Sequence, residues 1–221
     1  MSVHLFTFIF LTSHLIGRNY FKNLGDFLSL KRSSKQAIIE TTFLLSLKKG
    51  FDNVSVNDIG KYTSICGSSG IYYHFKKKED LLDHVIDKYV VENTNAFKNA
   101  LDSHNGTLIE KLKFVFYYHV GINILSGDNV PLADLINYKD YYLFFMNSFH
   151  IRPVFRNKLY ESRKGKLDCF VKNLSDGSLE NGLYIYAVLR GFIIDWILSP
   201  DFDLDVNIDR YCRMILSVLE K

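Results

Sequence analysis

The stretch from Val54 to Leu82 constrains the fold of this chain more than any other part of it. It reads as two short helices joined by a tight turn, followed by a longer helix that opens on a run of lysines. Ser55 and Asp58 have the spacing of a capping box, in which a hydroxyl caps the helix and a carboxylate three residues later reaches back. Ile59 follows as a core anchor. The pattern predicts a compact, locally connected helical unit.

The second short helix of this unit is polar and carries few charges, and Lys76, Lys77 and Lys78 follow it directly. Small residues in the turn before it, such as Gly67, accept irregular backbone dihedrals. A polar helix can enter a DNA groove while neighbouring cations hold the phosphates. The local chemistry therefore favours binding to double-stranded DNA.

Four segments in order carry a resemblance to a known family: Lys35-Gln36-Ala37-Ile38-Ile39-Glu40-Thr41-Thr42-Phe43-Leu44, Lys48-Lys49-Gly50-Phe51, Tyr72-Tyr73-His74-Phe75 and Lys78-Glu79-Asp80-Leu81-Leu82. Together they resemble the DNA-binding module of the TetR family of bacterial transcriptional regulators, over about a quarter of the chain. The chain departs from the family pattern in having Ser46 in place of a bulky residue and Ser64 in place of a glycine. One extra residue between Cys66 and Gly70 shifts the start of the recognition helix by one position.

The resemblance implies an all-α fold with two domains. We expect an N-terminal extension over residues 1–30, a three-helix helix-turn-helix DNA-binding domain over residues 31–84, and a helical ligand-binding and dimerisation domain over residues 85–221. The expected helices are Ser33–Lys49, Ser55–Tyr62, Ser68–His74, Lys78–Ala100, Leu108–Leu125, one or two within Pro131–Phe149, Pro153–Leu174, Glu180–Leu198 and Val206–Leu219.

Composition agrees with a helical protein that binds an anionic partner at one end. The 221 residues include only 3 prolines, and 48% of them are hydrophobic, so long helices and a substantial core are possible. Residues 1–84 hold 11 Lys/Arg against 7 Asp/Glu, whereas residues 85–221 hold 16 against 17. The positive excess lies with the proposed DNA-binding domain, as phosphate binding requires.

Signals for catalysis, metals and cofactors are weak in this sequence. The three cysteines, Cys66, Cys169 and Cys212, are scattered and lack the spacing of a zinc site, which favours a reducing compartment. There is no glycine-rich phosphate loop, nucleophile elbow or His-Glu-x-x-His motif. We therefore expect a cytoplasmic protein that is not an enzyme and needs no cofactor or metal.

The apolar segment Leu5–Leu11 leaves an alternative open. It is far shorter than the ~20 residues that span a membrane, and the residues before it lack the Lys or Arg of a signal peptide. We interpret it as an extension outside the DNA-binding domain and expect no membrane partner. A membrane tether through this segment is the competing reading.

Residues of the DNA-binding module divide by chemistry into base readers, phosphate contacts and core. Serine hydroxyls donate or accept, so Ser68 and Ser69 are candidates for permissive base reading, and Lys78 at a helix N-terminus suits a phosphate. Ile71 and Phe75, four residues apart, are expected in the core. The family resemblance extends the predicted DNA-binding set to Ser55, Gly67, Ser68, Ser69, Tyr72, Tyr73, His74 and Lys78.

The C-terminal half is rich in aromatic residues with scattered polar groups, a composition common in ligand cavities. An ordinary bundle core would use the same side chains for packing, and the family resemblance favours a cavity that binds a small-molecule effector. The candidate ligand-binding residues are Tyr117, Tyr118, Asn123, Tyr141, Tyr142 and Tyr184, with His119, Phe145, Asn147, His150 and Tyr186 as further members.

Two apolar stripes at helical spacing occur in the last two expected helices. In the TetR family the last two helices pair across a two-fold axis, so the stripes imply a homodimer that would place two recognition helices on a palindromic operator. Packing within one subunit would account for either stripe alone. The predicted dimerisation residues are Leu183, Ala187, Arg190, Gly191, Ile194, Leu198, Tyr211 and Ile215.

Two functional hypotheses follow from these features. The first is a DNA-binding transcriptional regulator, a ligand-responsive repressor that binds its operator as a homodimer. The alternative is a small-molecule-binding helical dimer with weak or no specific DNA binding, because the extra residue before Gly70 displaces the recognition helix.

Overall fold

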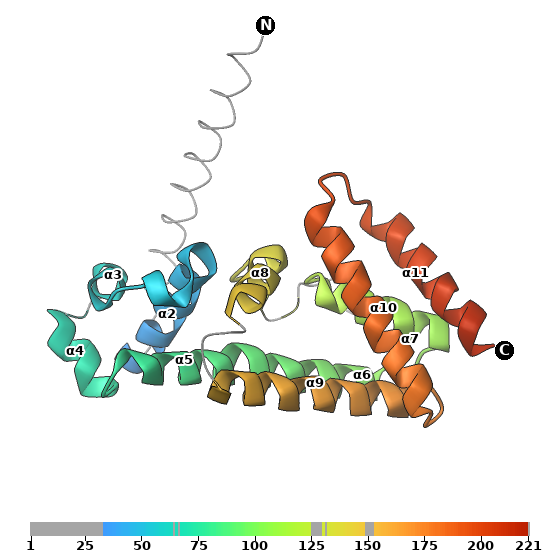
Figure 1. Ribbon diagram of the computed structural model, residues 1–221, viewed down its shortest axis with the longest axis horizontal. Coiled ribbons are helices and arrows are strands. Elements are labelled where there is room, and N and C mark those ends of the chain that lie inside the picture. Colours follow the sequence, from blue (N-terminus) through green and yellow to red (C-terminus); the bar gives the residue numbers. More distant parts are fainter. Residues whose placement is uncertain are drawn as a thin grey trace, which may run out of the picture. The chain divides into compact units, whose positions relative to one another are not determined.

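The computed structural model describes residues 33–63, 65, 67–124, 130, 132–148 and 153–220, and all secondary-structure elements within these ranges are helical (Figure 1). The chain separates into two compact units, and the division falls after Leu82, inside the helix Lys78–Ile86. The expected N-terminal extension, with Leu5–Leu11, lies outside the described residues. The all-α fold expected from the sequence is confirmed.

The first unit contains α2 (Ser34–Lys49), the short 3-10 turn η1 (Phe51–Asn53), α3 (Val56–Tyr62), α4 (Gly67–His74) and the beginning of α5 (Lys78–Ile86). Its core is made by one apolar face from each helix, and Ile71 and Phe75 belong to it as expected. The other large buried side chains are those of Ile38, Phe43, Leu44, Phe51, Val54, Ile59, Leu81 and Leu82.

Two buried hydroxyl groups of α2, those of Thr42 and Ser46, form hydrogen bonds within the helix. The Ser46 hydroxyl donates to the Thr42 carbonyl oxygen at 2.6 Å, and the Thr42 hydroxyl donates to the Ile38 carbonyl oxygen at 2.7 Å. A buried hydroxyl that satisfies itself on its own helix avoids most of the cost of desolvation. This explains how Ser46 occupies a buried position where the family pattern has a bulky residue.

The second unit contains the π-helical segment η2 (Asp87–Val91), α6 (Glu92–Ser103), α7 (Leu108–His119), α8 (Tyr138–Ser148), α9 (Pro153–Leu174), α10 (Leu179–Leu198) and α11 (Leu204–Leu219). α9 packs against both α6 and α10, while α11 packs against α7 and α10 (Figure 1). The single helix expected over Lys78–Ala100 is therefore interrupted by a π-helical turn.

Aromatic rings fill two parts of this unit. Phe97 of α6 lies parallel to Phe114 of α7 with ring centroids 6.3 Å apart, and Phe170 of α9 meets it edge-on. On the other side of α7, the ring of Phe116 meets the ring of Phe192 of α10 edge-on, with their centroids 4.8 Å apart. Such edge-to-face pairs add specific geometry to the apolar burial, so much of the aromatic content serves as core.

α7 ends at His119, six residues before the expected end. Gly121 adopts a φ of +89°, in the left-handed region that favours glycine. A Cβ at this position would lie 3.1 Å from the Tyr138 ring and 3.2 Å from the Ala133 methyl group. The chain must turn here because Gly121 fits closely against the segment that leads into α8.

Candidate nucleic-acid interface and effector cavity

The N-terminus of α3 is held by the capping box expected from the sequence. The Asp58 amide donates to the Ser55 hydroxyl at 3.0 Å, and the Ser55 amide donates to the Asp58 carboxylate at 2.9 Å. Lys49, at the end of α2, pairs with the same carboxylate at 2.6 Å. These bonds hold the pKa of Asp58 well below its usual range, with the Lys49 and Ser55 hydrogen bonds as the main causes. They connect α2 to α3.

α4 presents one apolar face to the core and one aromatic face to solvent. Ile71 and Phe75 are buried, while Tyr72 is 49% and Tyr73 85% exposed. Ser69 is also exposed, and the His74 ring meets the Tyr73 ring edge-on at 5.1 Å. Tyr73 in particular is almost fully exposed, so this face is open to a partner.

The predicted residues Gly67 and Ser68 are described only as backbone in the first turn of α4. A close approach fixes where this helix lies: a Cβ on Gly70 would be 2.2 Å from the side chain of Ile65. A side chain at position 70 would therefore require the Ile65 side chain to move. Gly70 thus lets the Ile65 side chain lie close against α4.

Of the three lysines after α4, two point to solvent and one contacts the protein itself. Lys76 and Lys77 are exposed. The Lys78 ammonium instead donates to the Asp52 carbonyl oxygen at 2.9 Å and lies 4.8 Å from the centre of the Phe51 ring. Lys78 therefore ties the start of α5 to η1, in addition to any contact with phosphate.

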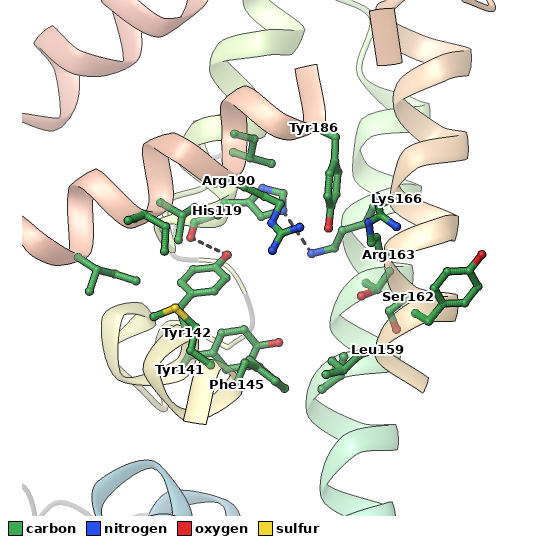
Figure 2. A pocket seen from close by; sticks show the side chains of 18 of the residues that line it. His119, Tyr141, Tyr142, Phe145, Leu159, Ser162, Arg163, Lys166, Tyr186 and Arg190 are labelled. Carbon is green, nitrogen blue, oxygen red and sulfur yellow. Dashed lines mark hydrogen bonds between the residues drawn. The ribbon is translucent and has the colours of Figure 1, made fainter. Parts of the chain in front are cut away.

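The second unit contains a cavity of about 430 Å³ (Figure 2). Its walls come from η2, α6, α7, α8, α9 and α10, and most of its area is apolar. The lining residues are Val90, Thr94, His119, Tyr141, Tyr142, Phe145, Met146, Arg156, Leu159, Tyr160, Ser162, Arg163, Lys166, Tyr186, Leu189, Arg190, Ile193, Ile194 and Ile197. This size and composition are typical of a small-molecule site.

A histidine and a lysine form the polar centre of the cavity. His119 Nδ1 lies 2.7 Å from the Val115 carbonyl oxygen, which only accepts, so Nδ1 carries the proton. Nε2 then accepts from the Lys166 ammonium at 3.3 Å. Burial, together with the Lys166 charge, lowers the pKa of His119 well below its ordinary value, and burial lowers the pKa of Lys166 to about 8. A neutral imidazole thus orients a cation.

Two predicted tyrosines line this cavity with their hydroxyl groups engaged. Tyr141 donates to the Tyr89 carbonyl oxygen at 3.0 Å, and Tyr142 donates to the His119 carbonyl oxygen at 3.1 Å. Burial raises the pKa of both phenols above the ordinary value. Their rings therefore form rigid walls and contribute no negative charge at neutral pH.

Other predicted residues lie elsewhere. The Tyr117 hydroxyl donates to Asp205 of α11, and burial followed by this hydrogen bond raises the pKa of Tyr117 to about 12. Tyr118 is buried against Phe97, and neither Asn123 nor Tyr184 lines the cavity. His119, Phe145 and Tyr186, the further members of the expected set, do line it. Only the backbone of Asn147 is described, and His150 lies outside the described residues.

The predictions missed the contribution of α9. Its positions 156, 159, 160, 163 and 166 face the cavity, at the spacing of one helical face. That spacing was available in the sequence, but the mixture of Arg, Leu, Tyr and Lys resembles an ordinary solvated helix. Only the packing of α9 between α6 and α10 shows that this face is covered.

The predicted stripe on α10 is exposed. Leu183, Ala187, Gly191 and Ile194 lie on the surface, and Leu198 is 75% exposed. α10 is also the one described helix long and apolar enough to cross a membrane, with only 33% of the relevant window buried. Its exposed apolar face adjoins Asp195, which accepts a hydrogen bond from Tyr211 of α11. Arg190 of the same stripe also lines the cavity.

The exposed face of α11 differs from the one expected. Ile215 is fully buried and Tyr211 is half-buried, because both turn toward the core of their own unit. The exposed apolar residues of α11 are Val206, Met214 and Val218. Ile215 therefore packs in the core of its own unit, while the role of Tyr211 in a dimer stays a prediction.

The order α3, turn, α4 and the packing of α3 against α4 give the first unit the arrangement of a helix-turn-helix. The pattern described as "Bacterial regulatory proteins, tetR family" matches residues 38–85. An HTH-type transcriptional regulator of Staphylococcus aureus (strain bovine RF122 / ET3-1) is 29% identical over 148 residues, which is 67% of this chain and 77% of the relative. The match over residues 38–85 and this relative together support a DNA-binding transcriptional regulator of the TetR family.

Solved structures share the fold over most of the chain. Bacillus subtilis FadR in complex with stearoyl-CoA superimposes with a TM-score of 0.61 at 18% identity, covering 82% of this chain and 97% of FadR. The multidrug binding protein EbrR complexed with malachite green gives a TM-score of 0.61 at 18% identity, covering 85% and 98%. At these identities the likeness establishes the fold alone.

Proposed function

We propose that this chain is a ligand-responsive repressor that binds a palindromic operator as a homodimer and releases it when the cavity is occupied. The observation that carries the proposal is the combination of a tyrosine-bearing exposed face on α4 with a separate, largely apolar cavity of about 430 Å³. A regulator needs two distinct sites of this kind for one to control the other.

The proposed DNA contacts follow from exposure and chemistry. Ser69 and Tyr72 stand on the open face of α4, where they reach the base edges of a major groove. Tyr73 and His74 reach the sugar-phosphate backbone, and the exposed Lys76 and Lys77 supply positive charge beside it. Ser55 and Lys78 support this surface through the capping box and the bond to Asp52.

The proposed dimer uses the outer faces of α10 and α11. The small residues Ala187 and Gly191 allow a second helix to approach closely, and no atom lies within 4 Å of the position of a Cβ on Gly191. Leu198 and Met214 would lose their exposure in such a contact. Exposed apolar surface of this extent marks an interface, and a helix pair repeated across a two-fold axis is self-complementary.

Solved proteins of this fold carry ligands as different as stearoyl-CoA and malachite green, which supports a cavity whose lining sets the choice of effector. A cytoplasmic protein without a membrane partner fits this function, because operator DNA and a soluble effector meet in that compartment. Cell fractionation tests this point: recovery in the membrane fraction alone would instead assign the exposed face of α10 to lipid.

The experiment that tests the function uses the full-length protein and fragmented genomic DNA of the encoding organism. Bound fragments are recovered and sequenced, and an enriched palindrome is expected. A bound pool without any enriched motif would support the alternative, a ligand-binding helical dimer without specific DNA binding. Sedimentation of the same protein, alone and on the enriched site, measures the number of subunits.

A further inference from the structure

Positive charge gathers on one side of the cavity. Lys166 and Arg163 come from α9 and Arg190 comes from α10, and in Figure 2 the Lys166 amine turns toward His119 with Arg190 and Tyr186 beside it. Arg163 stacks over the Tyr186 ring at 5.5 Å. None of the described lining residues is an Asp or a Glu.

These cations also lack counter-ions elsewhere among the described residues. The ion pairs of α9 join Lys158 to Asp83 and Asp87 and Lys172 to Asp102, all away from the cavity lining. Lys166 has only the neutral His119 imidazole and the face of the Phe97 ring, 5.7 Å away. An imidazole lone pair orients the ammonium group but leaves its charge uncompensated.

Most of the remaining lining is apolar, although Arg156, Thr94 and Ser162 also belong to it. α8 supplies Phe145 and Met146, α9 supplies Leu159, and α10 supplies a continuous strip formed by Leu189, Ile193, Ile194 and Ile197. A desolvated cation at one end of an apolar space is unfavourable until an anion pairs with it. A cationic ligand would add like-charge repulsion at the same place.

We propose that the effector is an amphipathic organic anion, with a carboxylate or phosphate group bound by Lys166, Arg163 and Arg190 and an apolar body along α8 and α10. This inference rests on the proposed function in taking the cavity as the effector site. Arg190 and Lys166 reach the head group from two different helices, so the anion bridges α9 and α10. The bridge gives occupancy a direct way to favour one spacing of these helices.

The test measures binding of four probes of equal chain length to the full-length protein by titration calorimetry: decanoate, decyl phosphate, decanol and decyltrimethylammonium. We expect at least one anionic probe to bind about tenfold or more tightly than decanol, because charge-assisted hydrogen bonds replace solvation. Decyltrimethylammonium is expected to bind most weakly. The stronger of the two anions identifies the head group.

Variants then locate the head-group site. Lys166→Met keeps the length of the side chain and removes its charge, and we expect it to weaken the anionic probe about tenfold to a hundredfold while leaving decanol within about twofold. Arg190→Met is the second variant, so the test does not depend on the folding of one protein. Lys164→Met, on the exposed side of α9 and outside the cavity, is the matched control.

Equal binding of the anionic and cationic probes, no binding of either anion, or unchanged anion affinity in both Lys166→Met and Arg190→Met would overturn the inference. A different outcome would contradict the proposed function and leave the anion site intact. If the anion binds and the variants behave as expected, but the operator complex is unaffected by saturating anion, the cavity is an anion site without a role in DNA release.

Discussion

The Lys49 ammonium lies 2.6 Å from the Asp58 carboxylate, and this ion pair joins the last turn of α2 to the first turn of α3. Asp58 also accepts from the amide and the hydroxyl of Ser55 at 2.9 and 2.7 Å. One carboxylate therefore fixes both the cap of α3 and its angle to α2. Because α3 packs against α4, the position of the DNA-facing helix depends on it.

We predict that Asp58→Asn lowers the stability of the first unit in a pH-dependent way. The folded pKa of Asp58 is depressed, so its stabilising effect is fully present above the unfolded value of 3.8 and is lost as pH falls toward the folded pKa. Thermal melting should show a clear difference between wild type and variant near pH 7 and a shrinking one below pH 4. Asp52→Asn, an exposed carboxylate in η1, is the control, and a difference that persists unchanged at low pH would refute the role of the charge.

Comparing Lys77→Ala with Lys78→Ala should separate a contact with phosphate from a contribution to the stability of the first unit. Lys77 is exposed, so its removal should weaken DNA binding at all sequences and lower the salt slope of log affinity by about 0.9. Lys78 also holds η1 through Asp52, so its loss should lower the melting temperature in addition to weakening DNA binding. Fluorescence anisotropy over a salt series and melting curves measure both. Unchanged salt slopes in both variants would remove the lysines from the interface.

Tyr73→Ala tests the exposed face of α4. Since the ring is 85% exposed, its loss should leave the melting temperature within about one degree while reducing operator affinity about tenfold or more, the effect of one strong contact. Tyr73→Phe asks whether the hydroxyl group or the ring makes the contact. An affinity equal to wild type in Tyr73→Ala would place the duplex elsewhere.

Ser69→Ala should change sequence preference more than overall affinity, because a serine hydroxyl at a base edge discriminates weakly. The measurement is the enriched motif from random-sequence selection with wild type and variant. A matching motif at all positions would exclude Ser69 from base reading. Ser103→Ala, in α6 of the second unit, controls for loss of a hydroxyl far along the chain.

The first unit was predictable because its signals are local. The capping box of Ser55 and Asp58, the core pair Ile71 and Phe75, and the end of α2 before Gly50 each depend on residues within one or two turns. The limits of α9 are those expected, since Pro153 starts it and the turn after Leu174 contains Gly177 with a φ of +83°. Helix boundaries set by proline and glycine follow from backbone sterics alone.

The second unit was less predictable because its site depends on distant contacts. Nothing near Lys166 in the sequence indicates that His119, 47 positions away, orients its ammonium group. Ile215 is buried and its neighbour Met214 is exposed, although both are apolar residues of the same helix. Composition therefore does not decide which of them faces α7 and α10. Tyr117 was expected in the cavity, but Asp205 of α11 holds its hydroxyl group.

Leu198→Glu and Leu183→Glu, at exposed positions outside the cavity, should dissociate the proposed dimer. Each places a carboxylate on the exposed apolar face of α10, where burial against a second copy would leave the charge without a partner. Sedimentation should show a monomer at concentrations where the wild type is a dimer, and operator affinity should fall with it. Leu143→Glu, an exposed apolar position on α8 outside the cavity, should stay dimeric. If the variants remain dimers, the interface lies elsewhere.

The affinity of the cavity for an anionic probe should depend on pH through Lys166. Of the groups beside its ammonium, His119 stays neutral because burial lowers its pKa, and the Tyr186 phenol stays neutral because burial raises its pKa. Arg163 and Arg190 are the charged side chains that line the cavity beside it. The Lys166 pKa of about 8 is therefore the one expected to act near neutrality. Affinity for decanoate should be constant between pH 6 and 7 and fall up to tenfold per pH unit above about 8.

The same titration affects the unliganded protein with the opposite sign. Because the folded pKa of Lys166 is lowered from 10.5 to about 8, the unfolded chain binds more protons between these values, and this group makes the folded state more stable as pH rises through that window. Decanoate affinity and unliganded stability should thus move in opposite directions above pH 8. Lys166→Met should flatten both trends, whereas Lys164→Met should keep them. Parallel trends, or trends retained in Lys166→Met, would assign the pH dependence to another group.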